Sequence, residues 1–444
     1  MSDAVKAAPA PAGPVAGGGV RIGFGAYYTL AALAIATTIA FLDRLLINLV
    51  VDPIRADVAI SDTQFSLLQG AAFAVTYTVA MLPIAWASDQ FNRKYIIIAS
   101  IVAWSAMTVA FGLAGSFAAL LILRAGVAIG EAGLTPAAVS IIRDVYPPHR
   151  QALAVSIMTL GVYLGGMISL SVGGPALAWL QDMHASGALP GGLSPWRYLF
   201  IGAGAIGLIG VLLLFFIREP VRAARAPGHS ATWRAFLGAV WEIRPRAIAF
   251  LLAFIGVHVV AAASAAWLPA LFMRNHGWPP ETVGLTFGIV HLAGGTLGAI
   301  GGGWMVDRLA TRGDRVALLR VVRIGGAALT LGTLLTAILP DPVMALAANG
   351  VGTIGAGICI GLGGLGFQAM LPAQFSARGM ATYVLAIGVI GGSLGPTVVP
   401  LLAKALGDGA NVGPALALWA GFAAIWVFFW ITRTMHLTRV RAAG

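Results

Sequence analysis

Charged side chains are scarce in this sequence. Only 10% of the 444 residues are Asp, Glu, Lys or Arg, whereas 59% are hydrophobic. Soluble proteins typically carry about 25% charged residues. The composition therefore excludes an ordinary soluble protein and predicts an integral membrane protein that crosses the bilayer several times.

Cysteine is nearly absent as well. The single Cys359 excludes a disulfide framework and a thiolate metal site, because both need more than one cysteine. The sequence also has no metal-ligand spacing, no Walker-type phosphate loop and no nucleophile elbow. We therefore expect no catalytic residues, no metal and no cofactor. An enzyme is not favoured, and the missing Walker-type loop argues against a process driven by ATP hydrolysis in this chain.

Basic residues outnumber acidic ones, which gives a formal net charge of +11. They fall in short segments between apolar runs and form no continuous patch, so we do not expect nucleic-acid binding. Most of the Lys and Arg residues lie in connections on the side of both termini. The positive-inside rule then places both termini in the cytoplasm, in a multi-pass protein of the inner (plasma) membrane.

Twelve apolar runs have about the ~20 residues that a helix needs to cross a bilayer core of ~30 Å. They predict an all-α membrane protein, because only helices and closed barrels satisfy their backbone in lipid. The runs are 26–51, 63–88, 95–115, 117–143, 151–180, 197–217, 247–273, 281–306, 317–339, 342–370, 379–406 and 413–432.

The longest polar connection divides these runs into two sets of six. We expect a six-helix bundle at 25–217, a cytoplasmic linker at 218–246 and a second six-helix bundle at 247–433. Residues 434–444 form a cytoplasmic tail. Residues 1–24 are rich in Ala, Pro and Gly and too poor in large apolar groups to pack, so a disordered cytoplasmic tail is expected there.

The two halves repeat a pattern at equivalent connections. In Ala85-Trp86-Ala87-Ser88-Asp89 and in Gly303-Trp304-Met305-Val306-Asp307, a small residue lies four positions before an acid, and basic residues follow. Loop charges placed only for topology are the alternative. Agreement at both sites favours two bundles of common origin, as in many secondary transporters. The candidate cytoplasmic gate residues are Asp89, Arg93, Lys94, Asp307 and Arg308.

This connection resembles the conserved cytoplasmic motif of the major facilitator superfamily. Within that family, three segments resemble the Spinster branch: Leu42-Asp43-Arg44, Asp89-Gln90-Phe91-Asn92-Arg93-Lys94-Tyr95 and the stretch from Arg124 to Ala132. The chain departs from the branch at Gln90, where Arg is usual, and the second half is less similar. The resemblance implies the superfamily's fold, neighbouring spans one and four, and proton-linked transport of sphingolipids or lysophospholipids.

Four charged residues lie well inside the first and fourth predicted spans, where each costs about 2.5–3.5 kcal/mol on insertion and usually marks a pathway. Asp43 and Arg44 are adjacent on a helix, so they diverge by about 100° and each is expected to pair elsewhere. Arg124 and Glu131 are seven residues apart, which places them on nearly one face, about 10 Å apart. All four can share a cavity if spans one and four are neighbours.

These charges predict a proton-coupling site. Burial favours the protonated form of a carboxylate, whereas a nearby arginine favours the ionised form. A carboxylate balanced between these effects takes a proton when the arginine moves away or binds an anion. We therefore assign proton coupling to Asp43, Glu131 and Arg124. A static ion-pair network that locks the first bundle is the alternative.

Arg44 is the candidate contact for an anionic cargo group, because guanidinium binds phosphate or carboxylate in a bidentate fashion. Pairing with Asp43 or Glu131 is the alternative role. His258 and His291 lie inside spans, and neutral packing roles are favoured over titration. Further residues that could line the cavity are Asn48, Tyr77, Tyr163, Trp267, Gln368 and Tyr383.

The second half has no counterpart of the four charges, and its spans are apolar and rich in glycine. This asymmetry suits an amphipathic cargo. We predict a proton-coupled secondary active transporter of an amphipathic organic anion that resembles a sphingolipid or lysophospholipid, working by alternating access. Its partners are that anion, protons and membrane lipids, and a monomer is sufficient. A carrier of small carboxylates or drugs, and a non-transporting membrane receptor, are the alternatives.

Overall fold

The computed structural model describes residues 23–220, 233–314, 316–372, 375–407 and 411–443. The expected tail at 1–24 and the centre of the expected linker therefore lie almost wholly outside the described residues. In the described part of the chain all regular elements are helical, and twelve of the helical segments are long and apolar enough to cross a membrane. The predicted all-α fold with twelve spans is confirmed.

The first six spans come from eight helices, because two spans are broken. They are α1 (Phe24–Leu46), α3 (Asp62–Gln69) with α4 (Ala71–Gln90), α5 (Arg93–Leu113), α6 (Phe117–Glu131) with α7 (Leu134–Val145), α8 (Pro148–Ala185) and α9 (Pro195–Phe215).

The second six spans come from seven helices, because one span is broken. They are α11 (Arg244–Asn275), α12 (Pro280–Thr311), α13 (Ala317–Ile338), α14 (Pro342–Gln368), α15 (Ser376–Ala386) with α16 (Gly392–Ala405), and α17 (Val412–Ala443). A π-helical turn at Ile387–Gly391 joins α15 to α16. The sequence did not predict the short helices α2 (Val51–Val58) and α10 (Trp233–Glu242).

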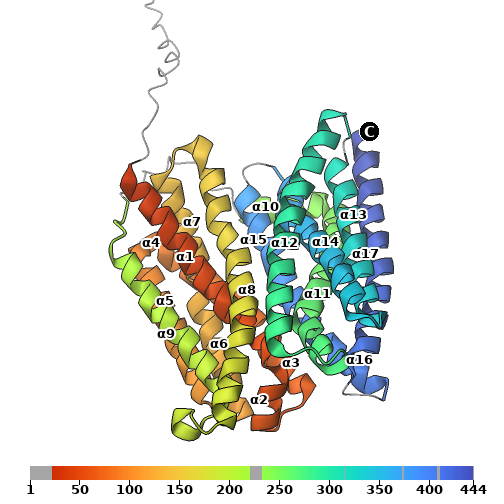
Figure 1. Cartoon of the computed structure of the whole chain (residues 1–444). Helices are drawn as coiled ribbons and strands as arrows, with labels where there is room; N and C mark the ends of the chain where they lie inside the picture. Colours follow the sequence, from red (N-terminus) through yellow and green to blue (C-terminus); the bar gives the residue numbers. More distant parts are fainter. Residues whose placement is uncertain (1–22, 221–232, 315, 373–374, 408–410, 444) are drawn as a thin grey trace, which may run out of the picture.

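The spans form two bundles that lie side by side, with α8 and α12 along their boundary (Figure 1). We call the end of the molecule where α1 begins and α17 ends the terminal face. The opposite face carries α2 and the connection after α16, at the bottom of the view (Figure 1).

Glycines let the two bundles approach closely. A Cβ at Gly284 on α12 would lie 2.2 Å from the Leu170 carbonyl oxygen and 3.0 Å from the Gly174 Cα of α8. A Cβ at Gly70, where span two breaks, would lie 2.9 Å from the Gly392 carbonyl oxygen. Main chain therefore meets main chain at two crossings between the halves, which only small residues permit.

Ion pairs join the halves at the opposite face. Arg274, at the end of α11, donates from Nε to both oxygens of Asp52 at 3.1 and 3.2 Å. Its Nη2 lies 3.2 Å from an oxygen of Asp62, and Arg55 Nε lies 2.9 Å from the same carboxylate. We call Asp52, Arg55, Asp62 and Arg274 the opposite-face cluster.

A third acid at the opposite face, Asp57, fastens α2 to the first bundle. Asp57 Oδ2 accepts from Trp196 Nε1 at 2.9 Å and from Arg197 Nε at 2.8 Å. Burial raises the pKa of Asp57, but hydrogen bonds from Ser194, Arg197 and Trp196 outweigh it, so that the pKa lies below its usual range. This acid therefore remains ionised over the physiological range.

Candidate functional site

An ion pair between spans one and four is the centre of the site. Arg44 lies in the last turn of α1 and Glu131 ends α6. Arg44 donates to Glu131 Oε2 from Nε at 3.1 Å and also from Nη2. The Glu131 side chain is 1% exposed and that of Arg44 is 25% exposed, so only the cation reaches open space.

Aromatic rings surround the Arg44 guanidinium. Its central carbon lies 4.5 Å from the Phe41 ring centroid, 4.4 Å from that of Phe73 and 5.0 Å from that of Tyr77. A desolvated cation–π contact contributes about 2 kcal/mol. The rings therefore stabilise the charge of Arg44 in an otherwise apolar setting, even when its carboxylate partner is absent.

Asp43 points away from Arg44, as the helix geometry predicts. It is buried, and its Oδ2 accepts from Thr108 Oγ1 on α5 at 2.6 Å. Arg124 on α6 is also buried and donates from Nη2 to the Arg44 carbonyl oxygen at 3.1 Å. The structure thus brings all four intramembrane charges together around the end of α1.

Three buried polar atoms of this group have no hydrogen-bond partner: Asp43 Oδ1, Arg124 Nε and Glu131 Oε1. An unpartnered buried polar atom carries a desolvation cost of about 1–3 kcal/mol. Each carboxylate therefore keeps one oxygen on which a proton or a water would be stabilising.

Sequence reasoning missed Thr108 and Phe73, because one Thr or Phe in an apolar run gives no signal of its contacts.

A cavity of about 320 Å³ opens beside Arg44. We call it the charged cavity. Arg44, Arg124 and Tyr77 line it from the first half, and Asn48 adds an amide whose oxygen accepts from Gln69 at 3.0 Å. Its wall in the second half is apolar and is formed by Ala262, Ala265, Ala266, Val384, Gly388, Gly392 and Pro396.

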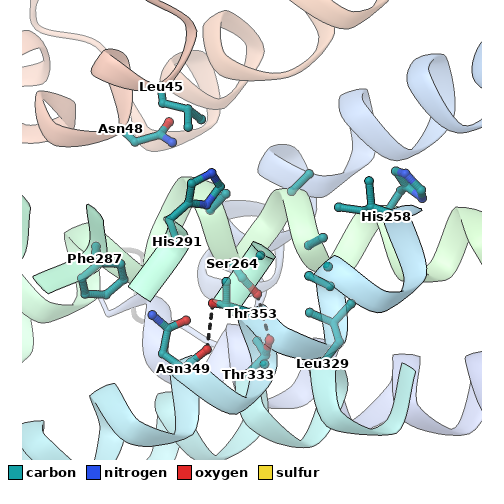
Figure 2. Close-up of a pocket in the computed structure, with 18 of the residues that line it drawn as sticks. Leu45, Asn48, His258, Ser264, Phe287, His291, Leu329, Thr333, Asn349 and Thr353 are labelled. Carbon is teal, nitrogen blue, oxygen red and sulfur yellow. Dashed lines mark hydrogen bonds between the residues drawn. The ribbon is translucent and has the colours of Figure 1, made fainter. Parts of the chain in front are cut away.

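A second cavity, of about 430 Å³, lies largely inside the second half. We call it the apolar cavity (Figure 2). Its hydroxyl groups at Ser264 and Thr333 bond to each other at 2.9 Å. It shares several lining residues with the charged cavity, so the two adjoin: Leu45, Asn48, Ala262, Ala265, Val384, Gly388 and Gly392.

Two histidines line the apolar cavity in different ways. His258 Nδ1 lies 2.9 Å from the Phe254 carbonyl oxygen of its own helix, which fits the favoured packing role. His291 Nε2 is buried without a partner, and its ring centroid lies 5.9 Å from that of Tyr163. Figure 2 shows the His291 ring directed toward the side from which Asn48 enters. His291 is therefore a further candidate cargo contact.

Two of the residues predicted to contact cargo lie elsewhere. Trp267 is fully buried and donates from Nε1 to the Pro396 carbonyl oxygen at 2.7 Å. Gln368 ends α14 and lines neither cavity. The polarity of these two side chains alone did not reveal which face of its helix each occupies. Asn48, Tyr77 and Tyr163 do line the cavities.

Two of the predicted gate residues, Arg93 and Lys94, form hydrogen bonds near the end of the first half. Arg93 is buried and binds within the first half, to Glu219 at 2.8 Å, Asp144 at 2.5 Å and Ser140 at 2.9 Å. Lys94 Nζ donates to the Phe215 carbonyl oxygen at 2.6 Å.

The remaining gate residues are Asp89, Asp307 and Arg308. The side chain of Asp89 lies outside the described residues. Asp307 and Arg308 are exposed, and the Arg308 guanidinium lies 5.5 Å from the Trp304 ring centroid. In the part of the chain that the structure describes, no group of His, Cys, Asp and Glu side chains could hold a metal ion.

Comparisons with known proteins agree with this architecture. The chain matches the family model of the Major Facilitator Superfamily over residues 33–396. It is similar to an MFS-type efflux pump of Mycolicibacterium smegmatis, with 29% identity over 88% of this chain and 89% of that protein. It is also similar to a D-galactonate transporter of Escherichia coli, with 24% identity over 93% of this chain and 96% of that protein.

Among solved structures, it is similar to a bacterial homologue of the human lysosomal transporter Spinster in an inward-facing and occupied conformation. The identity is 26%, the TM-score is 0.77, and the match covers 93% of this chain and 97% of that one. The segments around Asp43, Asp89 and Arg124 that resemble the Spinster branch lie within the residues matched by the family model. This chain belongs to the Major Facilitator Superfamily and is a Spinster-like member of it.

Proposed function

We propose that this chain is a proton-coupled secondary active transporter of an amphipathic organic anion. The observation that carries the proposal is the Arg44–Glu131 ion pair, which lies beside a cavity that continues into an apolar one. The pair supplies a cation for the anionic head group and a carboxylate for the proton. The apolar cavity supplies a surface for the rest of the cargo.

Proton coupling follows from competition for one cation. An anionic head group that binds Arg44 competes with Glu131 for the same guanidinium nitrogens. Glu131 is then a buried carboxylate without its counter-ion, and burial favours its protonated form. Asp43 and Arg124 set the charge balance around this exchange. Proton uptake and cargo binding at Arg44 therefore favour each other.

The relatives support a second candidate cargo. A D-galactonate transporter and a hexuronate transporter match this chain, and both names describe small hydrophilic acids. The charged cavity alone, at about 320 Å³, could hold such an anion at Arg44. The apolar cavity is the feature that favours an amphipathic anion over a sugar acid.

Topology follows the positive-inside rule. We infer that the terminal face is cytoplasmic, that the opposite-face cluster closes the outer side of an inner-membrane protein, and that a monomer is sufficient. The gate residues Asp89, Asp307 and Arg308 then lie at the cytoplasmic side. Arg93 and Lys94 stabilise that end of the first half.

Flux in proteoliposomes with imposed pH gradients tests the proposal. Wild type should accumulate cargo only with a gradient, and Glu131→Gln should lose the gradient dependence while Asp43→Asn weakens it. An exposed acid far from the site, Glu242→Gln, is the matched control. Gradient dependence that persists in both site variants would refute the proton assignment. Binding without accumulation in wild type would favour a receptor.

Cargo competition separates the two substrate classes. A lysophospholipid should inhibit uptake more strongly than a sugar acid if the apolar cavity takes part in binding. Leu45→Gln introduces a polar group between the two cavities, so it should weaken lysophospholipid inhibition and leave sugar-acid inhibition almost unchanged. Stronger inhibition by the sugar acid would replace the amphipathic anion with a small carboxylate.

A further inference from the structure

A groove on the outer surface of the second half lies between α13 and α17. Its volume is about 720 Å³, and both helices lie on the side of the bundle away from α8 (Figure 1). Neither the charged cavity nor the apolar cavity includes it. We call it the α13–α17 groove. It faces the region that lipid occupies in a membrane-spanning protein.

Residue spacing makes the groove one continuous apolar channel. On α17, Ile425, Phe428 and Phe429 recur at three- and four-residue intervals, so they form a single stripe. On α13, Ala327 and Leu331 are four residues apart and form the facing wall. The phenylalanine side chains are 55% and 57% exposed, so they project as ridges while the alanine leaves a hollow between the helices.

Basic side chains gather at the end of the groove toward the terminal face. Arg323 on α13 and Arg433 on α17 line the groove itself, together with His436. A contiguous hollow of about 380 Å³ shares Arg323 and His436 and adds Arg320 and Arg439. The channel is therefore apolar along its length and cationic at one end.

Most of this positive charge is uncompensated. Arg320 pairs with Asp314 at 2.9 Å. For Arg323, Arg433 and Arg439, the described residues contain no acidic partner within ion-pair distance. The Arg323 guanidinium instead lies 5.5 Å from the Phe428 ring centroid. Several unpaired cations close together repel one another, so an anion between them is stabilising.

The dimensions fit one lipid leaflet. Eight residues separate Arg323 from Leu331, which is about 12 Å along a helix. Half of a hydrocarbon core of ~30 Å is about 15 Å. Basic pockets between transmembrane helices bind the head groups of anionic lipids. We propose that the α13–α17 groove binds an anionic diacyl phospholipid, with its phosphate at Arg323 and Arg433 and an acyl chain along Phe428 and Phe429.

Lipid titration of the purified full-length protein, followed by native mass spectrometry, tests this proposal. The probes are phosphatidylglycerol and phosphatidylcholine with the same acyl chains, and inorganic phosphate. Wild type should bind phosphatidylglycerol at least tenfold more tightly than phosphatidylcholine. Arg323→Gln/Arg433→Gln removes two phosphate contacts and should weaken phosphatidylglycerol binding roughly tenfold or more.

The matched control is Arg244→Gln/Arg312→Gln, which removes the same charge from exposed positions outside the groove. It should retain the wild-type preference. If the groove variant does not fold, Arg433→Gln alone serves, because that side chain is exposed. Equal binding of the two lipids by wild type, an equal loss in the control, or displacement of phosphatidylglycerol by inorganic phosphate would each overturn the proposal.

Discussion

The Arg44–Glu131 ion pair allows a quantitative prediction. Two unit charges about 4 Å apart attract by about 4 kcal/mol at an effective dielectric constant of about 20. Removing both charges from water offsets part of that attraction. Measured coupling between contacting residues is about 0.5–3 kcal/mol. Because Glu131 is 1% exposed, we expect a value near the top of that range.

The losses in free energy of unfolding caused by the two single substitutions should add up to more than the loss caused by the double substitution. Glu131→Gln leaves Arg44 partly buried without a counter-ion, so it should lower the free energy of unfolding by about 3 kcal/mol. Arg44→Gln should have a similar effect, because it leaves an unpaired carboxylate. The double variant should lose little more than either single one. The coupling energy is then about 2–3 kcal/mol, or roughly a hundredfold in the unfolding equilibrium.

Equilibrium unfolding of wild type, the two single variants and the double variant, all in one detergent at neutral pH, measures this coupling. The Arg320–Asp314 pair, whose arginine is 41% exposed, provides a control cycle and should show about 0–1 kcal/mol. If the two single-site costs at Arg44 and Glu131 add to within about 0.5 kcal/mol, the pair is not energetically coupled, and the proposed exchange of partners loses its basis.

Three further predictions concern the opposite face. Gly284→Ala should destabilise the protein by about 1–3 kcal/mol through overpacking, whereas Gly301→Ala, which has no atom within 4 Å of an added Cβ, should be near neutral; thermal unfolding compares them. Asp57 has a lowered pKa, so its stabilisation is complete above the unfolded value of about 3.9 and is lost as the pH falls through the lower folded value. The difference in melting temperature between wild type and Asp57→Asn should therefore shrink below about pH 4, and a difference that stays constant would contradict the assignment. Arg274→Gln should loosen the opposite-face cluster. In a background without the native cysteine, it should therefore raise the reactivity of Leu45→Cys toward an impermeant thiol reagent added at that face. Unchanged reactivity would show that the cluster does not close this side.

Sequence reasoning predicted the fold well because a bilayer restricts the options. Long apolar runs must be helical in lipid, so the number of spans and the positions of their centres could be read directly. Helix ends were harder to place, because polar residues extend helices beyond the bilayer core. The fifth run therefore continues to Ala185 in α8, and the last run continues to Ala443 in α17. The amphipathic α2 is too short and too polar to produce a membrane signal.

The site was partly predictable for a similar physical reason. Charges inside apolar runs are costly, and this cost identified Asp43, Arg44, Arg124 and Glu131 before any geometry was known. Glu131 was one of the two alternative partners of Arg44, and the structure shows that pair. The hydrogen bond from Thr108 to Asp43 could not be inferred, because Thr108 is an ordinary residue in a membrane helix. Trp267 lines neither cavity, since the identity of a residue does not reveal which neighbouring helix it faces, and its assignment to cargo contact stays a prediction.

The crossing of α8 and α12 affects how one half can move against the other. Gly174 and Gly284 place main chain against main chain there, so at this point the crossing angle can change without a side chain changing its rotamer. Rocking of the two bundles needs one line that stays in contact while gaps open and close at either end. A smooth, glycine-lined crossing supplies such a pivot, and a bulky side chain at either position would act as a wedge.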